Sequence, residues 1–244
     1  MKLFPYSIIL ALLLAACGQQ KKEAPAVLPV AASDETTIYG LVCDGSNDTI
    51  IIYLREPYDG SDPDTLDILE ASKQQQVFGT LRVGDRVAIR RDSADAHKAS
   101  QIIVTQDLLG QWCYREKPTL KPKASMNSQD SLQLPDSLQQ LLNTQLEYGF
   151  TLKIDSVAQP IWPRNISIRA NEDSPIRFHQ PKRYRLWAIS DGQLLLTETS
   201  LDSLGNHVPI ATDTVSLVLL SADSLVLRYN DGDHGFYKKS EASE

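Results

Sequence analysis

The sequence predicts a mainly β protein, in which a small N-terminal β module is followed by an antiparallel β-barrel with one short helix. Three observations carry this prediction. Short segments rich in β-branched and aromatic residues recur along the body of the chain, and clusters of Gly, Asn, Asp and Ser separate them. Apolar and polar residues alternate within most of these segments. Short strands at such regular spacing favour a sandwich or an up-and-down barrel.

The first residues have the features of a secretory signal. Lys2 supplies a positive charge, and the apolar run 8–14 is shorter than the roughly 20 residues that span a bilayer. The tetrapeptide LAAC at 14–17 ends this run and resembles the lipobox of bacterial lipoproteins. This resemblance implies that residues 1–16 are a lipoprotein signal peptide and that Cys17 becomes the lipid-attached N-terminus. The alternative is an ordinary cleaved signal in which Cys17 is incidental.

Residues 17–36 are rich in polar residues, Ala and Pro and lack periodicity, which predicts a flexible tether. One acyl chain holds a protein on a membrane only marginally, whereas two or three hold it firmly. We therefore expect the protein to contact the membrane through its lipid anchor. Gly18 stands where Asp marks inner-membrane retention in enteric bacteria, so the bacterial outer membrane is the expected location. Its periplasmic and surface faces are both open.

Residues 37–107 are expected to form the N-terminal β module. Segments with strand character lie at 37–44, 49–56, 77–92 and 98–116. Between them, residues 62–74 begin with Asp-Pro-Asp and continue with helical spacing, which predicts a short helix. The stretch GTLRVGDRVAI at 79–89 is similar to the Gly-Asp-Val strand of OB-like barrels. This resemblance implies that the module is OB-like.

Residues 108–240 are expected to form the second domain, which a Pro-, Lys- and Ser-rich stretch at 116–135 interrupts. The leucines of residues 135–149 form one helical stripe ending at Gly149, which predicts a short helix that plugs or flanks a barrel. Strand-like segments then lie at 150–155, 163–170, 183–190, 193–202, 212–223, 224–231 and 234–240. Gly-containing turns join several of them, as expected for antiparallel neighbours.

Three pieces of this second domain resemble the lipocalin-like domains of Bacteroidetes lipoproteins. Gly110-x-Trp112 resembles the Gly-x-Trp that opens the first lipocalin strand, where the Trp packs across the barrel base. Residues 149–158 resemble the family's Gly-Phe-x-Leu-x-x-Asp-Gly-x-Ala hairpin, with Ser156 in place of the second Gly. A Trp-containing strand, a hairpin and a final strand pair follow in the family's order over 184–227. The resemblance implies a lipocalin-like antiparallel barrel with Gly110 and Trp112 at its structural base.

The resemblance also implies that a small hydrophobic or amphipathic molecule binds inside the barrel. The expected ligand-binding side chains are Phe150, Leu152, Leu186 and Leu194. The alternative is a solid core in a non-catalytic structural or interaction module that docks another envelope protein. The segments 193–199 and 215–220 are apolar on both faces, so one face can line the interior while the first module covers the other.

Two cysteines remain once Cys17 is assigned to the lipid. Cys43 and Cys113 are the disulfide candidate, because the envelope permits bridges and closing a loop of about 70 residues stabilises by roughly 4 kcal/mol. Two buried thiols are the alternative. No histidine lies at zinc-ligand spacing from either cysteine, so no metal site is expected. The 4 histidines are scattered and are interpreted as surface residues.

Other classes of function are not expected. The formal net charge is −7, and the chain has no basic patch with interleaved aromatics, which argues against nucleic-acid binding. No Gly-x-Ser-x-Gly, Ser-x-x-Lys, Walker or dinucleotide motif is present. No pair of carboxylates stands out as a glycosidase pair. We therefore expect no enzymatic activity, no catalytic residues and no cofactor.

Overall fold

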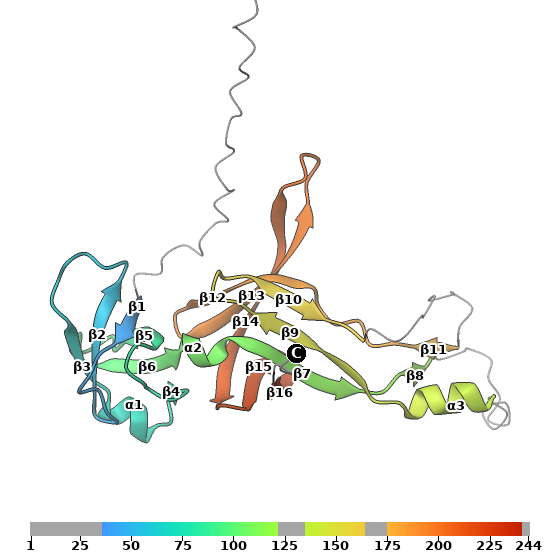
Figure 1. Cartoon of the computed structure of the whole chain (residues 1–244), viewed down its shortest axis with the longest axis horizontal. Coiled ribbons are helices and arrows are strands. Elements are labelled where there is room, and N and C mark those ends of the chain that lie inside the picture. Colours follow the sequence, from blue (N-terminus) through green and yellow to red (C-terminus); the bar gives the residue numbers. More distant parts are fainter. Residues whose placement is uncertain (1–35, 122–134, 164–174, 241–244) are drawn as a thin grey trace, which may run out of the picture. The chain divides into compact units, whose positions relative to one another are not determined.

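The computed structural model describes residues 36–121, 135–163 and 175–240 (Figure 1). The expected signal peptide, Cys17 and nearly the whole tether lie outside these ranges, as do most residues of the strand expected at 163–170. Within the described ranges, no helix has both the length and the apolar character needed to cross a membrane.

The first module is a six-stranded sheet with strand order β3-β2-β1-β5-β6-β4. Its elements are β1 (Thr37–Val42), β2 (Ile50–Glu56), β3 (Asp64–Asp67), α1 (Leu69–Lys73), β4 (Val77–Phe78), β5 (Arg86–Arg91) and β6 (Ala99–Val104). Neighbouring strands are antiparallel except for β4 and β6. Alternate side chains of β2 point into the module, where Ile51 and Tyr53 are fully buried. The β-branched run of β2 is therefore placed on a core strand.

The edge strand β3 meets the residues that lead into β6, which makes the module a small, partly open barrel. Asp67, the last residue of β3, forms a parallel bridge with Lys98, which leads into β6. The Asp67 backbone N–H donates to the His97 carbonyl oxygen at 2.9 Å. A three-stranded meander, a short helix and two strands that close between β1 and β3 form the arrangement of OB-type barrels. This strand order agrees with the expected OB-like module, and the OB-like assignment itself stays a prediction.

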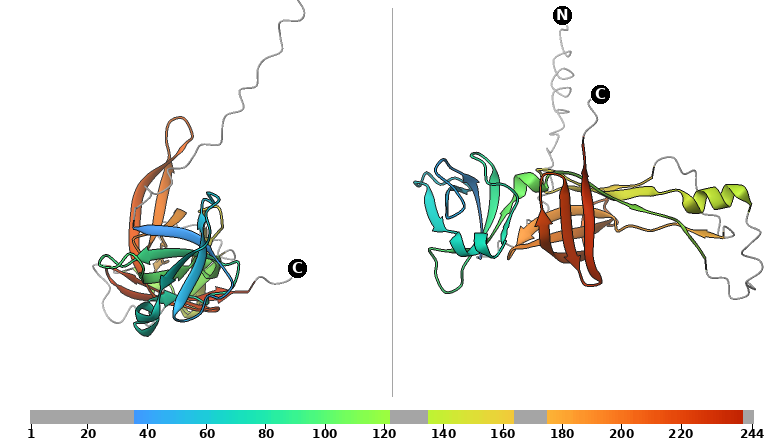
Figure 2. Two further views of the ribbon diagram at one scale, coloured as in Figure 1. Left: turned by 90° about the vertical axis from the view of Figure 1, so that its left-hand side faces the viewer. Right: turned by 90° about the horizontal axis from the view of Figure 1, so that it is seen from below.

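The second module is an eight-stranded sheet with strand order β10-β9-β7-β16-β15-β14-β13-β12 (Figures 1 and 2). Its strands are β7 (Gly110–Glu116), β9 (Leu146–Leu152), β10 (Ala158–Ile161), β12 (Tyr184–Ser190), β13 (Gln193–Leu201), β14 (His207–Leu220), β15 (Ser224–Tyr229) and β16 (Gly232–Lys239). The remaining elements are α2 (Thr105–Leu108), α3 (Asp136–Asn143) and the short strand pair β8 (Thr119–Leu120) and β11 (Ile176–Arg177). All neighbours in the eight-stranded sheet are antiparallel, and β16 returns to pair with β7. This order is that of an up-and-down barrel.

The two edges of the sheet, β10 and β12, meet at one bridge. Val157 and Leu186 form an isolated antiparallel bridge there. The Trp187 backbone N–H donates to the Ser156 carbonyl oxygen at 2.9 Å. Because these contacts join the edges over a short length, the sheet is a nearly closed barrel. The predicted antiparallel barrel is therefore confirmed.

The helix predicted over 135–149 is shorter than expected. α3 ends at Asn143, and Leu146 begins β9. Leu146 and Tyr148 are buried with the period of two of a strand, whereas no residue of α3 is buried. Burial of alternate side chains inside the barrel outweighs the local helical spacing of the leucines. The prediction that the helix ends at Gly149 is wrong, and α3 does not plug the barrel.

A register shift in β14 explains a segment that is apolar on both faces. The pairing with β15 shifts between Leu217 and Leu219, which is the signature of a β-bulge. Leu217 and Leu220 are both buried, whereas Val218 and Leu219 are exposed. The first module therefore does not cover these two exposed side chains, contrary to one of the expectations for this strand.

The main apolar core fills the barrel and includes residues of the first module. Trp112 and Leu194 of the barrel belong to the same buried cluster as Phe78, Ala88 and Ile103 of the OB-like module. A separate buried cluster lies within the OB-like module itself. The shared cluster means that the first module and the barrel bury apolar surface against each other.

Polar contacts to the turn between β12 and β13 reinforce this junction. The buried Gln101 donates its Nε2–H to the Gly192 carbonyl oxygen at 2.8 Å. The Arg90 guanidinium pairs with the Asp191 carboxylate at 2.7 Å. The Asp191 backbone N–H donates to the Thr37 hydroxyl at 2.8 Å. The tight turn that the Asp-Gly pair forms is therefore a docking point for the OB-like module.

Candidate functional site

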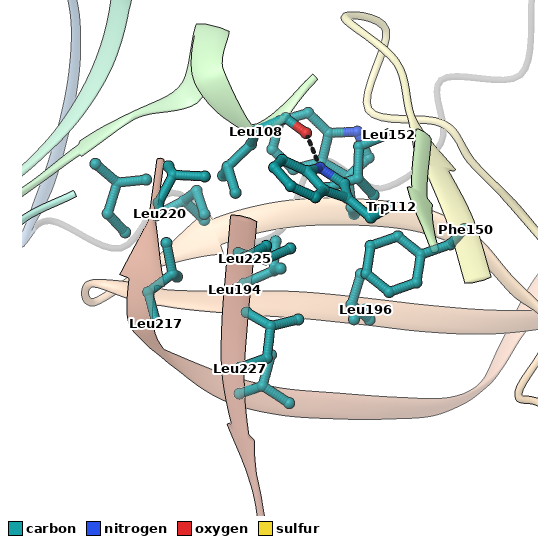
Figure 3. Packing of buried hydrophobic residues seen from close by; sticks show 14 of the residues in the cluster. Leu108, Trp112, Phe150, Leu152, Leu194, Leu196, Leu217, Leu220, Leu225 and Leu227 are labelled. Atoms are coloured by element: carbon teal, nitrogen blue, oxygen red, sulfur yellow. Dashed lines mark hydrogen bonds between the residues drawn. The ribbon is translucent and has the colours of Figure 1, made fainter. Parts of the chain in front are cut away.

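One end of the barrel interior, which we call the base, is closed by a tryptophan. Trp112 is fully buried, and its Nε1–H donates to the Leu108 carbonyl oxygen at 2.7 Å (Figure 3). The Lys238 ammonium lies 5.0 Å from the centroid of the indole ring. It also donates to the Asp107 carbonyl oxygen at 3.0 Å. Gly110 has φ +124°, and a Cβ there would lie 2.8 Å from the Lys238 Cε. Gly110 and Trp112 thus lie together at the base.

Packed apolar side chains occupy the interior next to the base (Figure 3). Phe150, Leu152 and Leu194 expose 4%, 1% and 0% of their surface and belong to one cluster. Leu186 is half-buried and lies outside that cluster, because a register shift before it turns Trp187 inward instead. The structure therefore brings three of the four expected ligand-binding side chains together as core. Their role in ligand binding stays a prediction.

The other end of the interior, which we call the mouth, is lined by tyrosines. Tyr114, Tyr148, Tyr184 and Tyr229 come from β7, β9, β12 and β15. Tyr114 lies two residues after Trp112 on β7, so both side chains share the inner face of that strand. The rings of Tyr114 and Tyr148 stack with their centroids 5.9 Å apart. Tyr184 and Tyr229 lie close enough for each side chain to affect the pKa of the other.

A chain of hydrogen bonds crosses one side of the mouth through His179. The Tyr114 hydroxyl lies 2.8 Å from the His179 Nε2, and the Glu116 carboxylate lies 3.0 Å from the His179 Nδ1. Because the carboxylate can only accept, the Nδ1–H donates to it and the hydroxyl donates to Nε2 when the ring is neutral. The His179 ring also meets Tyr148 edge-on at 5.3 Å. His179 is 35% exposed, so it lies at the surface as expected, and it also takes part in this network.

A second polar group lies on another side of the mouth, around Asp213 of β14. The Lys182 ammonium lies 2.7 Å and 2.6 Å from the two Asp213 carboxylate oxygens. The Tyr184 hydroxyl donates to the same carboxylate. Phe150 lies edge-on to Tyr184 with ring centroids 6.2 Å apart, so this polar group borders directly on the apolar core.

Burial raises the pKa of the tyrosine hydroxyls in the mouth. Loss of solvent is the main cause for Tyr114, Tyr148, Tyr184 and Tyr229, and nearby acidic groups add to it. The pKa of Tyr229 rises to about 12. These hydroxyls stay protonated at neutral pH and can donate hydrogen bonds. In the described part of the chain, the Tyr148 hydroxyl has no hydrogen-bond partner, so it is available to a ligand.

A hollow of about 340 Å³ adjoins this cluster. It is lined by Glu116, Lys117, Thr119, Arg177, Phe178, His179 and Gln180. His179 and Glu116 therefore belong both to the mouth and to the hollow. A second hollow of about 540 Å³ lies along the exposed face of α3 and is lined by polar side chains without an aromatic ring. Neither hollow is lined by the apolar side chains expected to bind a ligand.

Both cysteines expected to form a bridge are free thiols. Cys43 follows β1 in the OB-like module and is half-buried, and its Sγ–H lies 3.7 Å from the Leu41 carbonyl oxygen. Cys113 is fully buried within β7 of the barrel. The predicted bridge is absent from the structure: Cys43 lies just after β1 of the OB-like module, whereas Cys113 lies within β7 of the barrel.

The two thiols are expected to differ strongly in reactivity. Burial, helped by Glu147, raises the pKa of the Cys113 thiol to about 11, and the thiolate is the nucleophile. We expect iodoacetamide at pH 8 to alkylate Cys43 in the folded protein and Cys113 only after unfolding. Peptide mass spectrometry of native and urea-treated samples measures this. A native sample with both cysteines alkylated at equal rates, or lighter by two hydrogens, would contradict the structure.

Residues that commonly bind metals do not gather in the described ranges: no group of three or more His, Cys, Asp or Glu side chains is found there. The mouth residues were missed by the sequence reasoning for different reasons. Tyr114 and Tyr148 could have been found, because each lies two residues from an apolar core position of the same strand. His179 precedes β12 without any periodic pattern, so its place beside Tyr114 carries no sequence signal.

Comparison with known proteins gives one partial likeness. No family model matches the chain, and no curated protein sequence matches it. The crystal structure of a lipocalin-like protein from Bacteroides thetaiotaomicron is similar to it with 19% sequence identity and a TM-score of 0.27. The match covers 54% of this chain and 96% of that chain. The fold described above rests on this chain's own strand pairing, which makes it a mainly β protein with a nearly closed eight-stranded barrel.

Proposed function

We propose that this protein is a lipid-anchored lipoprotein of the bacterial cell envelope that binds a small hydrophobic or amphipathic molecule at the mouth of its barrel. The observation that carries the binding proposal is that the side chains lining the barrel interior change from apolar at the base to polar and aromatic at the mouth. The base is filled by buried apolar side chains, whereas the mouth presents tyrosines, two carboxylates and a hollow.

The size of the hollow and the two rings in its otherwise polar lining support this proposal. Small-molecule sites are typically about 300–1,000 Å³, with aromatic walls and a few placed polar groups. The hollow of about 340 Å³ falls within that range, and Phe178 and His179 supply its rings. A ligand there would rest on the rim of the barrel and not deep inside it, because Phe150 and Leu152 occupy the interior.

The anchor proposal rests on the sequence alone. The lipobox-like residues 14–17 and the polar stretch that follows would place the folded domains on a flexible tether at the outer membrane. The experiment compares the full chain with a Cys17→Ser variant in a Gram-negative host fed a radiolabelled fatty acid. The label should enter the unchanged chain and be absent from the variant. Equal labelling of both chains would sink the anchor proposal.

The binding proposal is tested on the same full chain, extracted from membranes and held in an amphipathic polymer. We expect native mass spectrometry to show an added mass that disappears on extraction with organic solvent. The Tyr148→Phe variant should lose occupancy, because it lacks the free hydroxyl, while Tyr58→Phe, a change at an exposed tyrosine, should retain it. A clean mass that persists after incubation with envelope lipid extract would contradict binding.

That negative result would favour the alternative function, a module that docks another envelope protein. One observation supports it. The far end of the β13–β14 hairpin carries the exposed apolar side chains Leu201, Leu204 and Ile210, which are 63%, 84% and 61% accessible. Exposed apolar clusters often mark protein contacts.

A further inference from the structure

We propose that the hollow beside the mouth recognises the anionic head group of an amphipathic ligand, such as a long-chain carboxylate, through Lys117 and Arg177. This inference rests on the proposed function and names the ligand class for the same site. The head group would lie in the hollow, which Lys117 and Arg177 line, and the ligand's apolar part would lie against the mouth.

The first observation is that both cations lack a carboxylate partner within the described residues. Lys117 follows the last residue of β7, and Arg177 ends β11, so two separate chain segments bring them to one hollow. Elsewhere in the same ranges, cations commonly have such partners: Arg55 pairs with Asp64 and Lys239 pairs with Glu147. The whole chain has a net charge of −7, whereas the hollow carries two cations without a carboxylate partner in the described ranges. The hollow is therefore locally positive on a negatively charged protein.

The acid that lines the same hollow does not cancel both cations. The Glu116 carboxylate accepts a hydrogen bond from the His179 Nδ1 at 3.0 Å. One carboxylate against two cations leaves the hollow with an excess positive charge. A carboxylate head group therefore fits the hollow better than an ammonium or an uncharged one.

Aromatic and hydroxyl groups continue from the hollow towards the barrel. Phe178 is half-buried and lines the hollow, and His179 meets the rings of Tyr114 and Tyr148 edge-on. The Tyr148 hydroxyl, which has no partner in the described part of the chain, can donate to the head group or to a polar atom next to it. Charge at one end and rings at the other are the chemistry of an anionic amphiphile.

The test uses the full chain in an amphipathic polymer and two probes that share one alkyl chain. The first is dodecanoate with a ¹³C-labelled carboxylate, and the second is uncharged dodecanol. We expect dodecanoate to bind at least about tenfold more tightly, and this preference to shrink as salt is raised, because exposed charges are screened. A shifted ¹³C carboxylate resonance reports the bound head group directly.

Paired variants locate the effect. The double variant Lys117→Gln and Arg177→Gln should lose the preference for dodecanoate and leave dodecanol binding unchanged. The double variant Lys153→Gln and Arg185→Gln removes the same charge from exposed positions outside the hollow and should keep the preference. Circular dichroism checks that both remain folded.

Three outcomes decide the matter. Loss of the preference only in the first double variant supports the inference. Equal binding of both probes, or an unchanged preference in that variant, overturns head-group recognition and leaves the proposed ligand binding intact. If neither probe binds and native mass spectrometry finds no added mass, the proposed function fails and the inference fails with it.

Discussion

Replacing Trp112 by alanine is expected to lower the free energy of unfolding by about 4 kcal/mol, the cost typical of truncating a buried tryptophan. The side chain is fully buried at the base, and its loss would leave a cavity next to Leu152 and Leu225. It would also remove the donor for the Leu108 carbonyl oxygen and the ring beneath the Lys238 ammonium. Urea unfolding followed by far-UV circular dichroism measures the change.

Two further variants separate the causes. Trp112→Phe keeps an aromatic ring but leaves the Leu108 carbonyl oxygen without its donor, so we expect an intermediate loss of about 2 kcal/mol. Trp162→Ala is the matched control, because Trp162 is only half-buried outside the core and lies 5.1 Å from the Arg183 guanidinium. We expect it to cost about 1 kcal/mol or less. Equal losses for Trp112→Ala and Trp162→Ala would show that Trp112 does not close the base.

Replacing Gly149 by alanine is expected to cost about 3 kcal/mol or more, because the new methyl group has no room. A Cβ at this position would lie 2.0 Å from the Trp112 carbonyl oxygen and 3.0 Å from the Cys113 Cα, which are both backbone atoms of β7. The two strands would have to separate along part of their ladder, and overpacking of this kind costs about 1–3 kcal/mol before any backbone strain is added. The same unfolding measurement applies.

The control lies on β16, on the other side of β7 from Gly149. Gly235 is in β16, and a Cβ there would meet no atom within 4 Å. We therefore expect Gly235→Ala to be neutral or slightly stabilising, because glycine in a strand has the larger conformational entropy to lose. If Gly149→Ala unfolds at the same urea concentration as Gly235→Ala, the close approach of β9 to β7 is not present in solution.

Gly149 also shows where local residue spacing fails to predict the secondary structure. Its position after a leucine stripe predicted a helix end, whereas the structure uses it for close strand contact. A similar error affects residues 62–74, where the helical spacing extends over β3 and only Leu69–Lys73 is helical. In both places some of the residues form a strand and not the helix that their local spacing favours, because a strand buries their side chains in a sheet. That burial depends on partners distant in sequence, so the local pattern does not show it.

The strands and their order along the chain could be predicted better from the sequence, because alternating polarity and tight turns are local signals. Asp191-Gly192 correctly marked the turn between β12 and β13. The sequence pattern does not predict the β-bulges. For this reason Leu186 was expected in the interior, where the structure places Trp187 instead. The mouth was also missed, since its polar groups come from strands and from the segment before β12, which meet only after the barrel has closed.

The pairing of β7 with β16 has a consequence for biosynthesis. Cys113 pairs with Tyr237, so the first and last strands of the barrel are joined across about 120 residues of chain. The OB-like module has all its strands once residue 104 has emerged, whereas the barrel keeps an unpaired edge of β7 until β16 is made. A newly made chain therefore passes through a stage with one folded module and one open, aggregation-prone sheet. Protection by chaperones matters most during that interval.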